Sequence, residues 1–227
     1  MKKQAQPNSQ KRYELHSSQF INIAFGKYTN RCDMLLQTKN PSLTPEFNDF
    51  AKNRMNWGSE HEIDGVSNWL IRCSNGKYPK FTLDDQKDFL LEDFDKNDET
   101  TVALSSKPDG LSDDEKTIIE IKCPNEGGKL KDDFDKTRLP QIFGQQLVLK
   151  HNGYPIEKTQ LCEWTPNVFR VWEIFPDEKF EEHLLNLLKE FSNCLLNGGD
   201  IDPKPKRYGG KYETYEKLFE VKIKWKI

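Results

Sequence analysis

The feature that most constrains the fold is an acidic turn followed by a strand that is both charged and apolar. The turn is Lys107-Pro108-Asp109-Gly110, and the strand contains Ile119-Glu120-Ile121-Lys122. Successive strand side chains point to opposite faces, so Glu120 and Lys122 share one face, while Ile119 and Ile121 share the other. Ile118 joins the charged face, so apolar residues flank both sides. This pattern predicts a buried strand, on which a charged pair requires a specific partner.

Two carboxylates and a lysine in this order are typical of a metal-dependent nuclease. Asp109 and Glu120 can hold Mg²⁺ beside a phosphate, and Lys122 can steady or deprotonate the attacking water. The structural alternative is an exposed hairpin with a Glu–Lys pair on one face, which stabilises by well under ~1 kcal/mol. These residues alone leave both interpretations open, and the rest of the chain distinguishes them.

Length and composition restrict the class of protein. A chain of 227 residues is long enough for one sizeable core. No apolar run approaches the ~18 residues that span a bilayer, and the polar start Met1–Asn8 is not a secretory signal, so we expect no membrane partner. Five scattered cysteines indicate thiols in a reducing, intracellular compartment, either the cytoplasm of a phage or virus host or a nucleus. They are Cys32, Cys73, Cys123, Cys162 and Cys194.

Charge is unevenly distributed along the chain, although the net charge is only -3. Residues 1–60 carry nine basic against five acidic side chains, and residues 203–227 carry eight against three. Residues 84–136 carry seventeen acids against eight bases. Basic ends around an acidic middle fit a cationic DNA groove next to a carboxylate site that binds metal. Solvated surface charge remains the alternative for most individual residues.

A long helix is predicted after Thr44-Pro45-Glu46, which has an N-cap residue, a proline at the first position and an acid in the first turn. One side of it is mostly small or apolar and includes Glu62, so we expect this carboxylate to face the interior and to need a cation. A position at the edge of a solvated face is the alternative for Glu62. The residues of this side are Gly58, Glu62, Gly65, Val66 and Trp69.

Further elements follow from apolar periodicity. We predict a strand at 102–104, a helix at 139–150, a hairpin of strands at 160–164 and 168–174, and an amphipathic helix at 180–195. The helix at 139–150 brings Gln141 close to the strand of Glu120, where it can orient the nucleophile or hold a phosphate oxygen. Acids at the strand ends would then gather at one edge of a sheet, where two Mg²⁺ ions about 4 Å apart can act together.

The ordered motifs resemble those of the phage lambda exonuclease family, the YqaJ-like viral recombinase group of the PD-(D/E)XK nucleases. The similarity runs from about Ser17 to about Phe191. The segments that carry it are Trp57-Gly58-Ser59-Glu60-His61-Glu62, Ser106-Lys107-Pro108-Asp109-Gly110, Glu120-Ile121-Lys122-Cys123-Pro124 and the helix from Gln141 to Leu147.

This resemblance implies an α/β fold with a restriction-endonuclease-like core, a central mixed β-sheet flanked by helices. It also implies a Mg²⁺-dependent 5′→3′ exonuclease that acts on double-stranded DNA ends and leaves 3′ single strands for recombination or repair. Two Mg²⁺ ions, with Mn²⁺ as a substitute, a ring-shaped homotrimer and a single-strand annealing protein as partner are further implications. We expect a disordered tail at 1–10, the nuclease domain at 11–202 and a basic extension at 203–227.

The resemblance assigns a role to each matching residue. It implies that the metal ligands are Asp109, Glu120 and the Ile121 carbonyl, with Glu62 serving the second metal. Lys122 takes the place of the catalytic lysine and Gln141 that of the motif glutamine. Ser18, with Arg12 nearby, takes the place of the pocket for the terminal 5′ phosphate.

Two departures from the family pattern stand out. The segment from Arg12 to Ser18 lacks the usual Trp and Gly of the phosphate pocket, and Phe143 replaces a second Gln. Loss of the pocket would favour an endonuclease or resolvase on the same fold. A decayed DNA-binding protein is opposed by the intact acids and lysine. An iron–sulfur nuclease is disfavoured, since Cys162 and Cys194 stand 32 residues apart.

Overall fold

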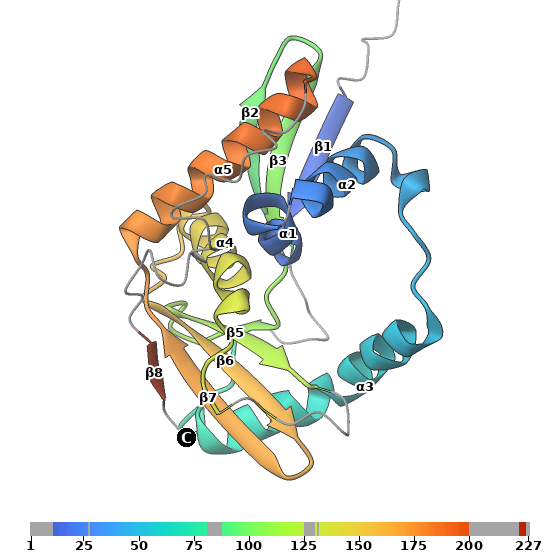
Figure 1. Cartoon of the computed structure of the whole chain (residues 1–227). Helices are drawn as coiled ribbons and strands as arrows, with labels where there is room; N and C mark the ends of the chain where they lie inside the picture. The colour runs from blue at the N-terminus through green and yellow to red at the C-terminus, as the bar shows by residue number, and fades with distance from the viewer. Residues whose placement is uncertain are drawn as a thin grey trace, which may run out of the picture.

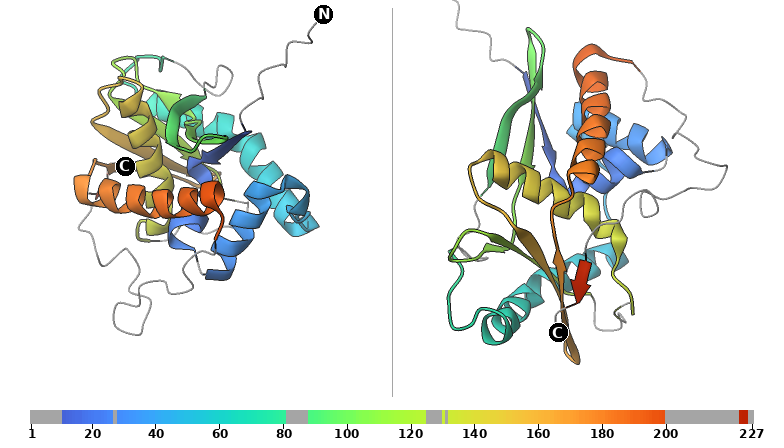
Figure 2. Two further views of the ribbon diagram at one scale, coloured as in Figure 1. Left: turned by 90° about the horizontal axis from the view of Figure 1, so that it is seen from above. Right: turned by 90° about the vertical axis from the view of Figure 1, so that its left-hand side faces the viewer.

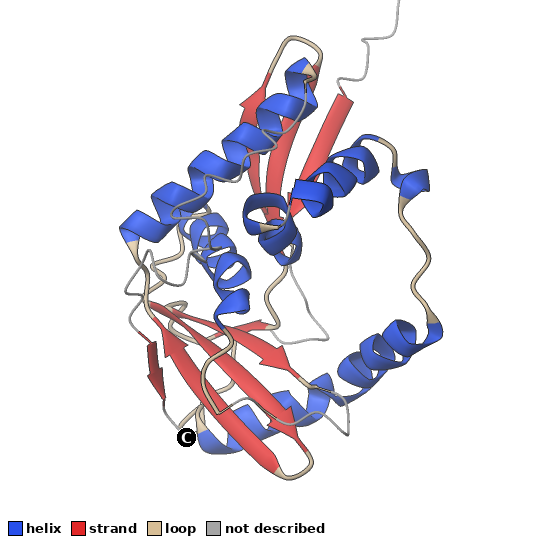
Figure 3. Ribbon diagram, in the orientation of Figure 1, coloured by secondary structure: helices blue, strands red, loops and turns tan. Residues whose placement is uncertain are grey.

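The strands form two separate mixed sheets (Figures 1 and 3). The computed structural model describes residues 11–26, 28–80, 88–124, 130, 132–199 and 223–225. The first sheet has the order β1-β3-β2, with β1 (Lys11–His16) parallel and β2 (Phe89–Lys96) antiparallel to β3 (Thr100–Ser106). Almost all of β3 is buried, because it is the central strand of this sheet.

The second sheet has five strands in sequence order, from β4 to β8. They are β4 (Gly110–Leu111), β5 (Thr117–Lys122), β6 (Lys158–Thr165), β7 (Val168–Ile174) and β8 (Ile223–Trp225). β5 and β6 are parallel, and the other neighbours are antiparallel. The predicted hairpin is therefore confirmed, and β8 is the edge strand of this sheet beside β7. Apart from β8, the expected extension at 203–227 lies outside the described residues, as does the tail at 1–10.

Residues 107–109 connect the two sheets, because β3 ends at Ser106 and β4 begins at Gly110. The predicted mixed α/β class is confirmed, but the single central sheet is divided at this point. Pro108 has no N–H to donate to a ladder, so a continuous strand is interrupted there. The division places Asp109 at the junction of the sheets.

Helices pack on both sides of the second sheet, as Figure 2 shows from two further directions. α4 (Leu139–His151) is surrounded by β3, α1 (Phe20–Phe25) and α5 (Glu178–Asn197), while α3 (Asp49–Arg72) covers the other face of β5 and β6. α2 (Tyr28–Lys39) packs on α1 and α5. Short 3₁₀ turns in the described part of the chain include η1 (Ser17–Gln19), η2 (Pro41–Leu43) and η4 (Lys136–Arg138).

The predicted start of α3 is wrong. The helix begins at Asp49, and the side chain of Asn48 caps it by accepting a hydrogen bond of 2.9 Å from the N–H of Ala51. Thr44, Pro45 and Glu46 lie in irregular structure before it. Asn and Thr are both good cap residues, and the side chain of Phe47, which lies between them, is exposed.

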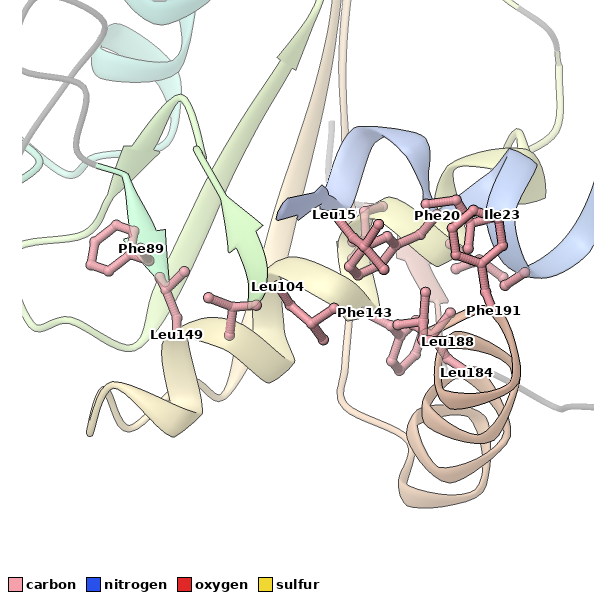
Figure 4. Packing of buried hydrophobic residues seen from close by; sticks show 14 of the residues in the cluster. Leu15, Phe20, Ile23, Phe89, Leu104, Phe143, Leu149, Leu184, Leu188 and Phe191 are labelled. Carbon is pink, nitrogen blue, oxygen red and sulfur yellow. The ribbon is translucent and has the colours of Figure 1, made fainter. Parts of the chain in front are cut away.

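β5 separates two apolar clusters, as its alternating pattern predicts. Ile118 belongs to the larger cluster with residues of α1, α4 and α5, part of which Figure 4 shows. Ile119 and Ile121 belong to a smaller cluster with Val66 and Trp69 of α3. Both faces of the strand are therefore covered, which agrees with the expected burial. Within the described ranges, no helix combines the length and apolar character needed to cross a bilayer.

Gly144 allows α4 to approach α1 and η1 closely. A Cβ atom at this position would lie 2.5 Å from carbons of the Phe20 ring and 3.3 Å from the Cβ of Ser17. We expect Gly144→Ala to destabilise the protein by about 1–3 kcal/mol through overpacking. Gly58→Ala on α3 is the control, because its added Cβ would be 3.8 Å from the nearest atom and gains up to ~1 kcal/mol of helix propensity. Thermal melts that shift equally for both variants would contradict this explanation.

Candidate active site

Glu120 is the buried centre of the site, with an exposed fraction of only 2%. Its Oε1 accepts a hydrogen bond of 2.6 Å from Gln141 Nε2, and its Oε2 accepts one of 2.6 Å from Gln145 Nε2. The Lys122 ammonium forms an ion pair with Oε1. Both oxygens of this carboxylate are thus satisfied, which is what a buried charge requires.

Asp109 lies at the point where the β4–β5 ladder ends. The last paired residues are Gly110 and Ile119, and Asp109 Oδ2 accepts a hydrogen bond of 2.6 Å from the N–H of Ile121. In a strand, the N–H and C=O of one residue point to the same side. The Ile121 carbonyl therefore faces the side of β5 on which the Asp109 carboxylate lies. A carbonyl and a carboxylate on one side of a strand are suitable oxygen ligands for a hard cation.

Glu62 is brought towards the same site by α3 and is half-buried. Trp57 Nε1 donates a hydrogen bond of 3.0 Å to the carbonyl of Pro124, two residues after the end of β5. Gly65 packs against Ile121 so tightly that a Cβ there would clash with its side chain. These contacts hold α3 against the end of β5, where the charges of Lys122 and Glu120 act on Glu62.

Without a bound cation, burial and the neighbouring carboxylates raise the pKa of Asp109 and of Glu62. Burial and the charge of Glu120 hold the pKa of Asp109 well above its ordinary value, although the Ile121 N–H opposes this shift. Burial also raises the pKa of Glu62, against the influence of Lys122. Burial lowers the pKa of Lys122, but Glu120 and Asp109 outweigh it, so the net direction is upward. The site therefore keeps Lys122 protonated and favours binding of an additional positive charge.

The donor chemistry fits a hard divalent cation. Asp109, Glu120 and Glu62 offer carboxylate oxygens, and Ile121 offers a carbonyl, a set that suits Mg²⁺ or Mn²⁺. In the described part of the chain, no three acidic, His or Cys side chains stand close enough to ligate one ion. Glu120 is instead turned towards Gln141, Gln145 and Lys122. Three of the roughly four acceptor sites of this carboxylate are therefore occupied, and the remaining one on Oε2 is available to a cation.

The two residues expected in the phosphate pocket lie apart from each other. Arg12 pairs with Thr101 at the start of β3, roughly 16 Å along the strand from Ser106, the last residue before the connection that holds Asp109. Its guanidinium forms ion pairs with Glu92 at 3.0 Å and with Glu14 at 3.6 Å. The structure does not bring Arg12 to the acids. Ser18 is exposed on η1, which packs against α4 and thus lies closer to the site.

Gln145 has no role in the motifs recognised in the sequence, yet its side chain donates a hydrogen bond directly to Glu120. Gln145 is fully buried and lies one helical turn after Gln141, so both project from one side of α4. Arg138 precedes Gln141 by one turn on the same side, and its charge acts on Lys122. Arg138, Gln141 and Gln145 follow an i, i+3, i+7 spacing. In the sequence, this spacing could have indicated that Arg138 and Gln145 lie on the same side of the helix as Gln141.

Asp109 should make the metal-free protein sensitive to pH. Its pKa is raised by folding from an ordinary value of 3.8, so the folded chain binds this proton more tightly than the unfolded chain. This contribution is complete below the ordinary pKa and is lost as the pH rises through the raised folded pKa. Asp109→Asn keeps an acceptor for the Ile121 N–H but removes the charge.

We therefore expect Asp109→Asn to melt at a higher temperature than the wild type at about pH 8 in EDTA, and this advantage to shrink towards about pH 5. The measurement is a series of thermal melts of both proteins. A variant that is less stable at about pH 8, or that keeps a constant difference across the range, would show that the buried charge carries no such cost.

Comparison with known proteins supports the fold. No protein-family model matches the chain, and no curated protein sequence matches it. A crystal structure of a phage-related exonuclease from Haemophilus somnus 129PT is similar with a TM-score of 0.55 at 11% identity, covering 80% of this chain and 94% of that chain. The crystal structure of SSO0001 is similar with a TM-score of 0.50 at 12% identity, covering 83% and 77%. The chain thus has a mixed α/β fold with a restriction-endonuclease-like core.

Proposed function

We propose that this protein is a metal-dependent nuclease that hydrolyses the phosphodiester bonds of DNA. The observation that carries the proposal is the cluster at one end of β5, in which the buried acids Asp109 and Glu120 lie beside the partly exposed Lys122. An arrangement of this kind costs stability and is explained by a requirement for a cation. The fold similarity to a phage-related exonuclease supports the same class of activity.

The more specific proposal is a Mg²⁺-dependent 5′→3′ exonuclease that degrades one strand of duplex DNA and leaves 3′ single strands for recombination or repair. Asp109, Glu120 and the Ile121 carbonyl would hold Mg²⁺, with Glu62 serving a second ion and Mn²⁺ as a substitute. Bound Mg²⁺ supplies Lewis acidity and lowers the pKa of a coordinated water. These roles extend the resemblance to the lambda exonuclease family, which stays a prediction.

The side chains around the acids have complementary tasks. Lys122 carries its proton, so its ammonium can orient a nucleophilic water or neutralise charge that develops on the phosphate. Gln141 and Gln145 hold the two oxygens of Glu120 and thereby fix its direction. The Ile121 N–H fixes one oxygen of Asp109, which leaves the other available to a ligand.

One observation favours an endonuclease or resolvase on the same fold. Arg12, the expected partner of the terminal phosphate, is engaged by Glu14 and Glu92 and lies at the other end of β1 from η1. A phosphate pocket that contains Ser18 but lacks this arginine would bind the terminal 5′ phosphate of DNA weakly. An enzyme without end recognition would cut within the duplex. The catalytic cluster is the same in both cases, so the two activities differ only in substrate geometry.

Assembly and partners are also proposals. A homotrimeric ring that encloses the duplex would retain the enzyme on DNA, and a single-strand annealing protein would receive the product strand. Large apolar side chains at the start of α3 and before it are more than half exposed, which supports a contact with another chain. They are Leu43, Phe47, Phe50 and Met55.

Substitution of the cluster should abolish cleavage without unfolding the protein. We expect Asp109→Ala, Glu120→Ala and Lys122→Ala each to lower the rate at least about a hundredfold, because each removes charge stabilisation of the transition state. Lys116→Ala, at the opposite end of β5, is the control and should cleave normally. The assay follows linear duplex and closed circular plasmid on one gel, with Mg²⁺ or EDTA. Normal digestion by Asp109→Ala or Glu120→Ala would contradict the site assignment.

End preference separates the exonuclease from the endonuclease. If Ser18 contacts the terminal phosphate, 5′-phosphorylated duplexes should be digested roughly ten- to a hundredfold faster than 5′-hydroxyl duplexes, because a charge-assisted hydrogen bond is lost with the phosphate. Ser18→Ala should reduce this ratio, whereas Ser42→Ala on η2 should not. Equal rates on both ends, together with nicking of closed circles, would establish the endonuclease alternative instead.

A further inference from the structure

Arg138 is the last residue of η4 and stands at the N-terminus of α4, one turn before Gln141. Its backbone is already in the helical region, with φ -80° and ψ -20°, so the helical periodicity of α4 extends to it. Arg138, Gln141 and Gln145 therefore occupy one side of the helix at i, i+3 and i+7. The two glutamines bind Glu120, which establishes that this side faces β5.

The guanidinium of Arg138 is close enough to the Lys122 ammonium for the two positive charges to interact. Glu120 and Asp109 act on the same ammonium with opposite charge. Lys122 is compensated by these acids, with which it shares the site. Arg138 has no comparable compensation, because in the described segments no carboxylate forms an ion pair with it. Because the two cations share one set of acids, part of their positive charge remains uncompensated at the outer edge of the site.

The other arginines in the described part of the chain each have a visible partner. Arg31 pairs with Glu190 at 3.1 Å, and Arg12 and Arg170 also have acidic partners. Arg54 and Arg72 lie over aromatic rings. Arg138 has neither kind of contact among the described residues, yet it is only half exposed. An arginine held at this position without a protein partner is suited to an anionic ligand.

We propose that Arg138 binds a backbone phosphate of the DNA strand that lies against Lys122, and thereby positions that strand for cleavage. The rise of α4 places Arg138 about 4.5 Å further towards its N-terminus than Gln141, outside the acid cluster. A guanidinium can hold two phosphate oxygens at once, whereas the acids would repel an uncompensated phosphate. The inference rests on the proposed nuclease function and adds a substrate-positioning residue to it.

The test measures DNA binding separately from cleavage. A fluorescently labelled, 5′-phosphorylated duplex is titrated with the full-length protein in Ca²⁺ at several NaCl concentrations, and a gel confirms that the duplex is intact. The proteins compared are the wild type, Arg138→Gln, Arg138→Lys and the control Lys116→Gln. Lys116 is an exposed cation at the opposite end of β5, where it pairs with Glu157.

We expect Arg138→Gln to weaken binding about ten- to a hundredfold and to reduce the slope of log K against log[salt] by about 0.9, the loss of one phosphate contact. Arg138→Lys should keep the slope, because the charge remains, but lose affinity, because lysine cannot hold two oxygens. Lys116→Gln should match the wild type. A purely structural role of Arg138 would lower the melting temperature but would leave the salt slope unchanged.

The outcomes distinguish a failure of this inference from a failure of the proposed nuclease function. If the wild type neither binds nor digests DNA, the nuclease proposal itself fails. If the wild type does both and Arg138→Gln retains its affinity and slope, the nuclease proposal stands and the role of Arg138 is overturned. An equal loss in Lys116→Gln would also overturn it, by showing a general charge effect. Should Arg138→Gln fail to fold, Arg138→Lys decides, since unchanged affinity would contradict a bidentate contact.

Discussion

The buried carboxylate of Glu120 is the interaction on which both the fold and the site depend. It lies on a strand covered on both faces, so its charge must be met by protein groups, and α4 provides two amides while Lys122 provides an ammonium. Removing one partner would leave a buried charge only partly compensated, which lowers the stability of the fold. The packing of α4 against β5 is therefore required for stability and for the chemistry at once.

The site is assembled where independent parts of the fold meet. Asp109 belongs to the connection between the two sheets, Glu120 and Lys122 to β5, Gln141 and Gln145 to α4, and Glu62 to α3. Three of these parts are fixed by short contacts: the Ile121 N–H to Asp109, the glutamine amides to Glu120, and the close approach of Gly65 to Ile121. These contacts thus set the distances between acids that would otherwise repel one another.

Much of this arrangement follows from sequence pattern. Alternation around Glu120 predicted a strand with two covered faces, and helical periodicity predicted α4 and α5, because each signal reflects burial of an apolar side. The start of α3 was not predictable, since Thr44 and Asn48 are both good cap residues and Thr44 is followed by a proline and an acid, which also favour a helix start. The division into two sheets and the contact of Gln145 with Glu120 depend on how distant segments approach, which local pattern does not contain.

The unequal size of the two apolar clusters has a consequence for how the protein opens. α3 contributes three buried residues from its length of 24, whereas the other face of β5 is held by a cluster that spans most of the remaining elements. Free energies of local opening follow the apolar contacts that are lost, so α3 should detach more often than α4 does. Such an excursion would withdraw Glu62 while Asp109, Glu120 and Lys122 stay in place. Amide hydrogen exchange would then show two cooperative units, α3 and the rest of the fold, and the boundary between them would pass through the acid cluster.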